Sequence, residues 1–321
     1  MKVWIIVLIV VLVLFFIILP SIIFTYAGSQ TVKMLKKSDI KMRNMKNVDI
    51  SFYDRGPLKE LASKGLDFMK TLDVDETFIT SYDGFKLQAY VIKNPYMQTN
   101  KYFLGMHGFK SGPRHEYAPY LKYYLDAGFN IIIPCERAHY ESEGDYITMG
   151  LKEKYDVVSW CNYIVNTYGE DIKILIQGIS MGGATVCLAS SLDLPKQVVG
   201  IVSDCAYTSL KDELKFQMSK FSKHIPMNLF LNVINLFIKA KLHVSMNDTQ
   251  PIDAVKDAKV PMIFCHGSKD EMVDVEFSKQ LYNACGNDKK IIIDENANHA
   301  ETIAYQKQKY IDTILDFFNL R

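Results

Sequence analysis

One stretch constrains this chain more than any other: an apolar, β-branched run at 172–177 leads directly into Gly178, Ser180 and Gly182. The pattern Gly-x-Ser-x-Gly, between a strand-like run and small residues able to start a helix, predicts a sharp turn that exposes the serine as a nucleophile. Glycine is needed at both flanks because a Cβ there would collide with the neighbouring strand and helix. The backbone N–H of Met181 would begin the helix, where developing negative charge is favoured.

Strand and helix patterns alternate after residue 74. An Asp-Gly turn at 83–84 joins strands at 76–80 and 86–92 into a hairpin. Further strands are expected at 102–106, 129–134, 172–177, 198–203, 261–265 and 290–294, and helices near 58–72, 116–127, 152–168, 181–191, 276–285 and 301–319. This pattern predicts a mostly parallel, twisted sheet flanked by helices, with functional side chains at the carboxyl ends of its strands.

Two polar loops after late strands supply partners for the serine. The order Ser180, Asp270, His299 is the one that a strand–serine–helix nucleophile of this type requires. His299 would take the serine proton and return it to the leaving group, while Asp270 would orient the imidazole and stabilise its charged form. Asp204, after the strand at 198–203, is a rival for the acid, and Asp274 is a weaker one.

A second loop, after the strand at 102–106, reads His107-Gly108-Phe109. Gly108 allows this loop to fold back beside the serine turn. The amide of Phe109 would then pair with that of Met181 as the two donors that stabilise an oxyanion.

Several motifs carry a likeness to a known family. They are His107-Gly108-Phe109, Arg137-Ala138-His139, Gly178-Ile179-Ser180-Met181-Gly182, the run from Ser203 to Ser209, and the run from His266 to Asp270. On these motifs the chain resembles the α/β-hydrolase superfamily from about residue 74 onward. It is most similar to the bacterial, membrane-anchored branch that includes Bem46-type, prolyl-oligopeptidase-like and serine-aminopeptidase-like hydrolases. The resemblance implies a serine hydrolase. One departure is Tyr140, which stands where the family usually has glycine and puts the shape of the pocket in question.

Residues 208–250 interrupt the alternation of strands and helices with apolar side chains and interspersed lysines. They are expected to form either a helical pair on the core or a lid over Ser180 with an apolar lining. The only acids early in this segment, Asp212 and Glu213, are expected to face solvent. An apolar lid favours an acyl ester or thioester of carboxylesterase type as the substrate, with aminopeptidase-like amide hydrolysis as the alternative. A catalytically silent relative that binds a lipid or protein is the third possibility.

The N-terminus carries an unbroken apolar run from Val3 to Leu19. Its length favours a single-pass membrane anchor at 1–27 over a cleaved signal peptide, whose apolar part spans about 7–15 residues. A basic tether at 28–56 and a hydrolase domain at 57–321 would follow. The lysines after the run favour a cytoplasmic domain, whereas long domains cross membranes regardless of charge, so both orientations stay open.

Charge and cysteine content exclude other classes. Lysine and arginine number 37 against 36 acidic residues, so no basic excess suggests nucleic acid as a partner. The six cysteines show no paired spacing and are expected to be buried thiols. We expect no metal and no cofactor, and a small or lipid-like acyl substrate.

Overall fold

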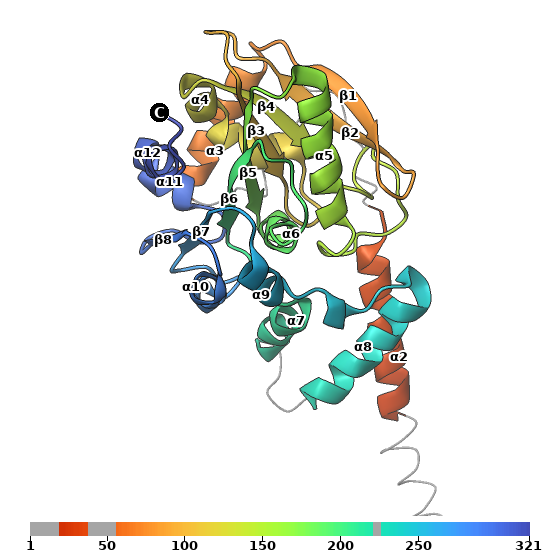
Figure 1. The fold of residues 1–321 in the computed structure, drawn as a ribbon. Coiled ribbons are helices and arrows are strands. Elements are labelled where there is room, and N and C mark those ends of the chain that lie inside the picture. Colours follow the sequence, from red (N-terminus) through yellow and green to blue (C-terminus); the bar gives the residue numbers. More distant parts are fainter. Residues whose placement is uncertain (1–18, 38–55, 221–225) are drawn as a thin grey trace, which may run out of the picture.

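The computed structural model describes residues 19–37, 56–220 and 226–321, and an eight-stranded sheet forms its centre (Figure 1). The strands are β1 (Asp75–Thr80), β2 (Lys86–Ile92), β3 (Lys101–Met106), β4 (Phe129–Pro134), β5 (Lys173–Ile179), β6 (Val198–Asp204), β7 (Met262–Gly267) and β8 (Lys289–Asp294). Their order is β1-β2-β4-β3-β5-β6-β7-β8. β2 pairs antiparallel with β1 and β4, and all pairings from β4 to β8 are parallel. The predicted α/β-hydrolase fold is confirmed.

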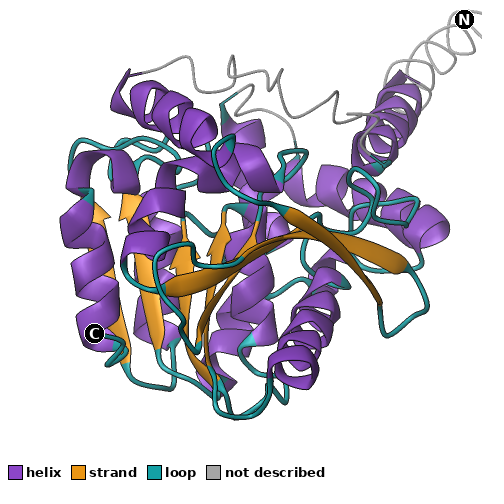
Figure 2. Cartoon of the chain, turned by 90° about the horizontal axis from the view of Figure 1, so that it is seen from above, coloured by secondary structure: helices purple, strands orange, loops and turns teal. Residues whose placement is uncertain are grey.

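Helices cover both faces of the twisted sheet (Figure 2). One face is covered by α3 (Gly56–Met69), α4 (Pro113–Asp126), α11 (Thr302–Gln306) and α12 (Gln308–Phe317). The other is covered by α5 (Glu153–Tyr168), α6 (Met181–Ala189), α9 (Pro251–Ala254), the 3-10 turn η4 (Val255–Asp257) and α10 (Val275–Ala284). Because the central strands are buried on both faces, they read as continuous apolar runs rather than alternating ones.

The predicted hairpin forms between β1 and β2, and Gly84 in its turn has a φ of 89°. The helix expected at 301–319 is instead two helices, α11 and α12. They are separated at Lys307, whose φ of 50° lies in the left-handed region that ends a helix.

The segment predicted as a helical pair or lid contains α7 (Leu210–Ser219), α8 (Met227–Leu242) and a 3-10 turn, η3 (Met246–Asp248). Ser209 caps α7 by accepting a hydrogen bond from the Asp212 N–H. α8 lies away from the sheet and packs against the N-terminal helix α2 (Leu19–Leu35), with which it forms a separate apolar cluster (Figure 1).

The N-terminal segment differs from the expected tether in part. Residues 28–35, assigned from the sequence to the tether, belong to α2, and both Val32 and Leu35 are buried. The Ile147 N–H donates to the Leu35 carbonyl at 2.7 Å, so α2 is joined to the hydrolase domain. Within the described ranges, no single helix is both long and apolar enough to cross a membrane. Residues 3–18 of the predicted membrane anchor lie outside the described residues.

Candidate active site

Ser180 occupies a strained turn between β5 and α6. Its backbone has φ 57° and ψ −117°, a conformation that costs a non-glycine residue on the order of 1–3 kcal/mol. Neither flanking glycine could carry a side chain: a Cβ at 178 would lie 2.7 Å from the Gly183 nitrogen, and one at 182 would lie 2.6 Å from the Met106 carbonyl carbon. Close packing of β5, α6 and β3 therefore imposes the turn that raises Ser180 above the sheet edge.

Asp270 and His299 form a short ion pair after β7 and β8. His299 Nδ1 lies 2.7 Å from Asp270 Oδ2, while Asp270 Oδ1 accepts hydrogen bonds from the N–H groups of Met272 and Val273. Burial opposes charge on both groups. The imidazoles of His299 and His266 nevertheless hold the pKa of Asp270 well below its usual range, and the Asp270 carboxylate raises the pKa of His299 from its ordinary value.

A second histidine holds the same carboxylate, and sequence reasoning missed its role. His266 Nε2 lies 3.0 Å from Asp270 Oδ2, and His266 Nδ1 lies 2.6 Å from Ser278 Oγ. His266 is fully buried, and its ring holds the same carboxylate oxygen that His299 contacts. The residue was visible in the sequence as the first of the run that ends at Asp270.

The rival acids have other partners. Asp204 is buried and accepts hydrogen bonds from the hydroxyls of Tyr120 and Tyr310, at 3.3 and 3.1 Å, and burial raises its pKa. Asp274 caps α10 by accepting from the Glu276 N–H. Of the three aspartates considered from the sequence, Asp270 is the one that hydrogen-bonds to His299.

Cys205 connects the serine turn with the histidine. Its Sγ lies 3.9 Å from His299 Nε2, the ring nitrogen not used by Asp270, and it also approaches the Ser180 N–H. The Ser180 N–H donates at 2.8 Å to the carbonyl of Asp204, which is the residue before Cys205. His299 Nε2 therefore faces Cys205, whose thiol lies next to the Ser180 N–H.

Among the described residues, the side chains around His299 could also hold a metal ion. Donor atoms of Cys205, Asp270 and His299 lie within 4.8 Å of one another. A soft metal ion bound there would compete with proton transfer at His299.

The thiols of all six cysteines are free and buried, as the sequence predicts.

Two buried histidines shape the loop that carries Phe109. His107 accepts from the Glu136 N–H at Nε2, 3.0 Å, and donates from Nδ1 to the Gly108 carbonyl, 2.8 Å. His139 accepts from the Lys110 N–H at 3.1 Å, and burial lowers its pKa to about 4. Both rings are neutral in these roles, since each accepts at one nitrogen.

The two predicted oxyanion donors come from neighbouring segments. The side chains of Phe109 and Met181 pack in one small cluster with Ala138 and Ile147. Met181 is the first residue of α6, so its N–H is among those that a helix leaves without an internal partner.

Glu116, on α4, reaches back under this loop and was not anticipated. Its Oε2 accepts from the Gly108 N–H at 2.9 Å. A Cβ at 108 would lie 2.8 Å from Glu116 Oε1 and 3.4 Å from Ser180 Cβ, so the carboxyl lies close to the serine. Burial raises the pKa of Glu116 to about 7, against the hydrogen bonds from Ser111 and Gly108 that lower it.

Tyr140 takes the backbone conformation that glycine adopts freely. Its φ is 47°, in the left-handed region, which costs an L-residue about 1–2 kcal/mol. The ring is buried and lies over Gly112, where a Cβ would come within 2.6 Å of Tyr140 Cε2. The Tyr140 ring thus fills space next to the loop of Phe109, while the Tyr140 backbone keeps the left-handed conformation that glycine would adopt.

The expectation that both acids of α7 face solvent was wrong for Glu213. Asp212 pairs with Lys215 at the surface, at 3.1 Å. Glu213 Oε1 accepts from Gln217 at 2.8 Å, but Oε2 is buried and has no hydrogen-bond partner among the described residues. Burial raises its pKa to about 7, and the charges of His299 and Asp270 act on it. Glu213 is therefore a partly buried carboxyl group on α7, within electrostatic range of the catalytic pair.

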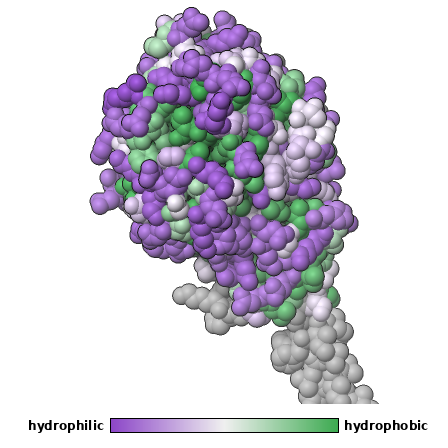
Figure 3. All heavy atoms as spheres, viewed as in Figure 1, coloured by the Kyte–Doolittle hydropathy of each residue, from purple (hydrophilic) through white to green (hydrophobic). Residues whose placement is uncertain are grey.

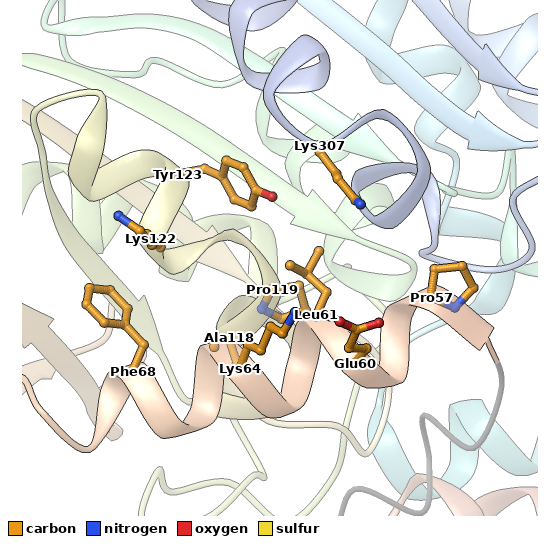
Figure 4. Close-up of a pocket in the computed structure, with 11 residues that line it drawn as sticks. Pro57, Glu60, Leu61, Lys64, Phe68, Ala118, Pro119, Lys122, Tyr123 and Lys307 are labelled. Atoms are coloured by element: carbon orange, nitrogen blue, oxygen red, sulfur yellow. Dashed lines mark hydrogen bonds and ion pairs between the residues drawn. The ribbon is translucent and has the colours of Figure 1, made fainter.

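A cavity of about 290 Å³ lies elsewhere, between α3 and α4 (Figure 4). Its walls include Leu61, Phe68 and Tyr123, with Lys307 at the rim. None of Ser180, Asp270 and His299 lines it, so it has no part in the chemistry of that group.

Comparison with known proteins places the chain in a family. The sequence profile of the prolyl oligopeptidase family matches residues 139–320, more than half of the chain. The chain belongs to the prolyl oligopeptidase family. It is also 24% identical over 200 residues to Uncharacterized protein YqkD of Bacillus subtilis (strain 168), an alignment that spans 62% of this chain and 65% of that relative.

Solved structures similar to this family member include both esterases and a peptidase. The Pyrococcus furiosus esterase Pf2001 has a TM-score of 0.61 at 22% identity, covering 78% of this chain and 90% of that chain. Acetyl xylan esterase 1 from Thermoanaerobacterium has a TM-score of 0.54 at 15% identity, covering 82% and 93%. The Pyrococcus horikoshii acylaminoacyl peptidase has a TM-score of 0.58 at 18% identity, covering 80% of this chain but 43% of the peptidase. Membership of the prolyl oligopeptidase family agrees with the α/β-hydrolase fold of the chain.

Proposed function

We propose that this protein is a carboxylesterase-like serine hydrolase that cleaves acyl esters or thioesters through an acyl-serine intermediate. The observation that carries the proposal is the Asp270–His299 pair at 2.7 Å, with the other ring nitrogen of His299 facing Cys205, whose thiol approaches the N–H of Ser180 in its strained turn. Serine, histidine and aspartate in this order are the groups that acyl transfer needs.

In the proposed reaction, Ser180 Oγ attacks the acyl carbonyl carbon while its proton passes to His299 Nε2. The N–H groups of Phe109 and Met181 hold the oxyanion of the tetrahedral intermediate. Collapse breaks the bond to the leaving alcohol or thiol, which takes the proton from His299. Water then attacks the acyl-serine, again giving its proton to His299, and the acid leaves as Ser180 recovers its hydrogen.

Asp270 acts through His299 in this scheme. Its carboxylate stabilises the imidazolium that forms when the serine proton is taken, and its hydrogen bond at Nδ1 keeps Nε2 free to accept that proton. His266, with its two hydrogen bonds, keeps the carboxylate in place.

Two observations support an ester over a peptide. The lid helices contribute many apolar side chains, of which Leu214, Phe216 and Met218 on α7 are partly buried. The chain also corresponds to nearly the whole of an esterase but to less than half of the acylaminoacyl peptidase. The assignment within the family, to its membrane-anchored Bem46-type or serine-aminopeptidase-like members, is part of this proposal.

One observation favours amide hydrolysis as the second candidate. Glu213 has a buried carboxyl oxygen without a hydrogen-bond partner among the described residues, within electrostatic range of His299 and Asp270, and it could bind the ammonium group of an aminoacyl substrate. A panel of p-nitrophenyl esters of rising chain length, acyl thioesters and aminoacyl p-nitroanilides, given to the full chain in detergent, separates the two. If aminoacyl amides turn over faster than every ester, the order of the two candidates is reversed.

A fluorophosphonate probe tests whether the protein is a catalyst at all. The probe should label the wild type and not Ser180→Ala. Absence of labelling in correctly folded wild-type protein would mean a silent relative that binds a lipid or protein partner.

The membrane anchor is a further part of the proposal. It rests on the apolar run that begins at Val3 and continues, without a charged residue, into α2. The full chain should remain in the membrane fraction after alkaline carbonate, and protease protection in sealed vesicles should assign the side of the catalytic domain. A mature protein that begins near Gly28 would instead identify a signal peptide.

A further inference from the structure

Helices α2 and α8 lie side by side and run in the same direction. Phe24 packs on Phe230 with ring centroids 5.9 Å apart, and four residues later on α2 a Cβ at Gly28 would lie 2.7 Å from the ring of Phe237. Contacts therefore advance together along both helices. The N-terminal ends share one side of the pair, and the C-terminal ends share the other (Figure 1).

The outer surface of this pair is apolar toward its N-terminal end. On α2, Ile22, Ile23 and Tyr26 are 59%, 53% and 66% exposed, and on α8, Leu229 and Leu236 are 53% and 65% exposed. Single exposed apolar residues are common on soluble proteins, but five on two adjacent helices form a patch. Hydrophobic residues gather over these two helices in Figure 3. We call this surface the α2–α8 face.

Charge divides the face along its length. Neither helix contains an acidic residue, while exposed lysines follow toward the C-terminal end: Lys33 on α2, and Lys239 and Lys241 on α8. With a rise of 1.5 Å per residue, Lys33 lies about 15 Å along its helix from Ile23, and Lys239 about 15 Å from Leu229. Ile23 and Leu229 are thus separated from the lysines by a distance comparable to one half of a bilayer. Two further exposed apolar residues, Leu236 and Met34, lie within one turn of Lys239 and Lys33.

The sequence before α2 indicates what covers the face. Residues 3–18 are apolar without interruption and lead directly into α2, which begins at Leu19. If residues 3–18 insert into a lipid bilayer, the N-terminal ends of α2 and α8 are the next parts of the chain to contact it. We propose that the α2–α8 face lies on the lipid bilayer, with Ile22, Ile23 and Leu229 at the acyl chains and the lysines among the phosphates.

This contact would bring the active site to the membrane surface. Phe109, whose N–H is a proposed oxyanion donor, packs against the same apolar cluster as the inner sides of α2 and α8. The cluster around α2 and α8 would therefore connect the bilayer with the catalytic loop. The inference deepens the proposed function, on which it rests, by naming membrane-dissolved, long-chain acyl esters as the substrates that reach Ser180 from the bilayer.

The position of the face can be measured directly. In the full chain reconstituted into phosphatidylcholine–phosphatidylglycerol vesicles, a polarity-sensitive fluorophore is attached at Leu229→Cys, and in a second variant at Met97→Cys. Met97 is similarly exposed, at 50%, but follows β2 at the opposite part of the domain. The emission of the first label should shift to the blue and be quenched by brominated acyl chains, whereas the second should behave as in water.

Activity supplies the second measurement. Leu229→Glu combined with Leu236→Glu should lower hydrolysis of vesicle-dissolved p-nitrophenyl palmitate about tenfold, since two apolar contacts with lipid are replaced by charge. Hydrolysis of soluble p-nitrophenyl butyrate should stay within about twofold of the wild type, and Met97→Glu should change neither rate.

The outcomes separate the two proposals. A water-like spectrum at residue 229 overturns the membrane contact whatever the activity, and so does a blue shift that persists without lipid and grows with protein concentration, because a second copy then covers the face. Wild-type protein that hydrolyses no ester overturns the proposed function, while the fluorophore still decides the position of the face. Equal palmitate rates in wild type and double variant contradict delivery of substrate from the bilayer.

Discussion

The contact between α6 and β3 makes a quantitative prediction for Gly182→Ala. The new Cβ would lie 2.6 Å from the Met106 carbonyl carbon and 2.8 Å from the His107 carbonyl oxygen, both backbone atoms. Ordinary contacts begin at 3.4 Å and the Met106 carbonyl oxygen lies closer still, so the start of α6 must move away from β3 by at least about 0.8 Å. Met181 is the residue before the substitution, and its N–H moves with the helix. Misplacement of a catalytic group by about 1 Å can cost about 10²-fold in rate.

We therefore expect kcat/KM for p-nitrophenyl butyrate to fall about 10²-fold in Gly182→Ala, mainly through kcat. Overpacking should lower the free energy of unfolding by about 1–3 kcal/mol, measured by urea titration of tryptophan fluorescence. Gly84→Ala is the control: its φ of 89° makes alanine strained there, but nothing lies within 4 Å of the new methyl group. It should lose about 1–2 kcal/mol of stability with no change in kcat/KM. Wild-type kcat/KM in Gly182→Ala would refute the link between this contact and the oxyanion donor.

Three further predictions follow from the charged groups of the site. Because the reaction requires neutral His299 and Asp270 raises the pKa of that histidine, kcat/KM should fall as the pH falls, with a midpoint above that of an unperturbed histidine. In Asp270→Asn the midpoint should move to lower pH and the rate should fall about 10⁴-fold. An unmoved midpoint would contradict the pairing. Glu116→Leu removes the acceptor for the Gly108 N–H and should lower kcat about tenfold with little change in KM. Glu116→Gln keeps an acceptor and should therefore retain most of the wild-type kcat. Equal losses of kcat in the two variants would argue for a role of charge instead. If the Glu213 carboxylate binds an ammonium group, Glu213→Gln should raise KM for aminoacyl substrates about tenfold and leave KM for simple esters unchanged. An equal effect on both substrate classes would indicate that Glu213 has a structural role in α7.

The sequence was sufficient for the fold because the governing signals are local. The apolar strand runs, the Asp-Gly turn and the Gly-x-Ser-x-Gly turn each specify their own backbone, and their order along the chain fixes which loops meet at the sheet edge. Asp270 and His299 could be placed together for this reason. The choice between Asp270 and Asp204 needed coordinates, since both follow strands and only hydrogen bonding separates them.

Residues whose role depends on distant packing were not predictable. Glu116 reads as an ordinary acid in the first turn of a helix, and its burial arises only because the loop of Gly108 folds over it. Glu213 and Asp212 are neighbours with the same chemistry, yet Glu213 has a buried carboxyl oxygen whereas Asp212 pairs with Lys215 at the surface. Residues 28–35 appeared to be a tether because their polar and basic residues conceal Val32 and Leu35, which are spaced to meet α8.

The pairing of α2 with α8 also has a consequence for synthesis of the chain on the ribosome. The two helices are joined across about 200 residues, so α2 leaves the ribosome long before its partner exists. At about 5–20 residues per second, its apolar side waits on the order of 10–40 s for α8. During that interval the buried face of α2, including Val32 and Leu35, must be covered by something other than the finished protein. Production of this chain should therefore depend on chaperone or membrane capacity more strongly than its compact, locally specified sheet would require.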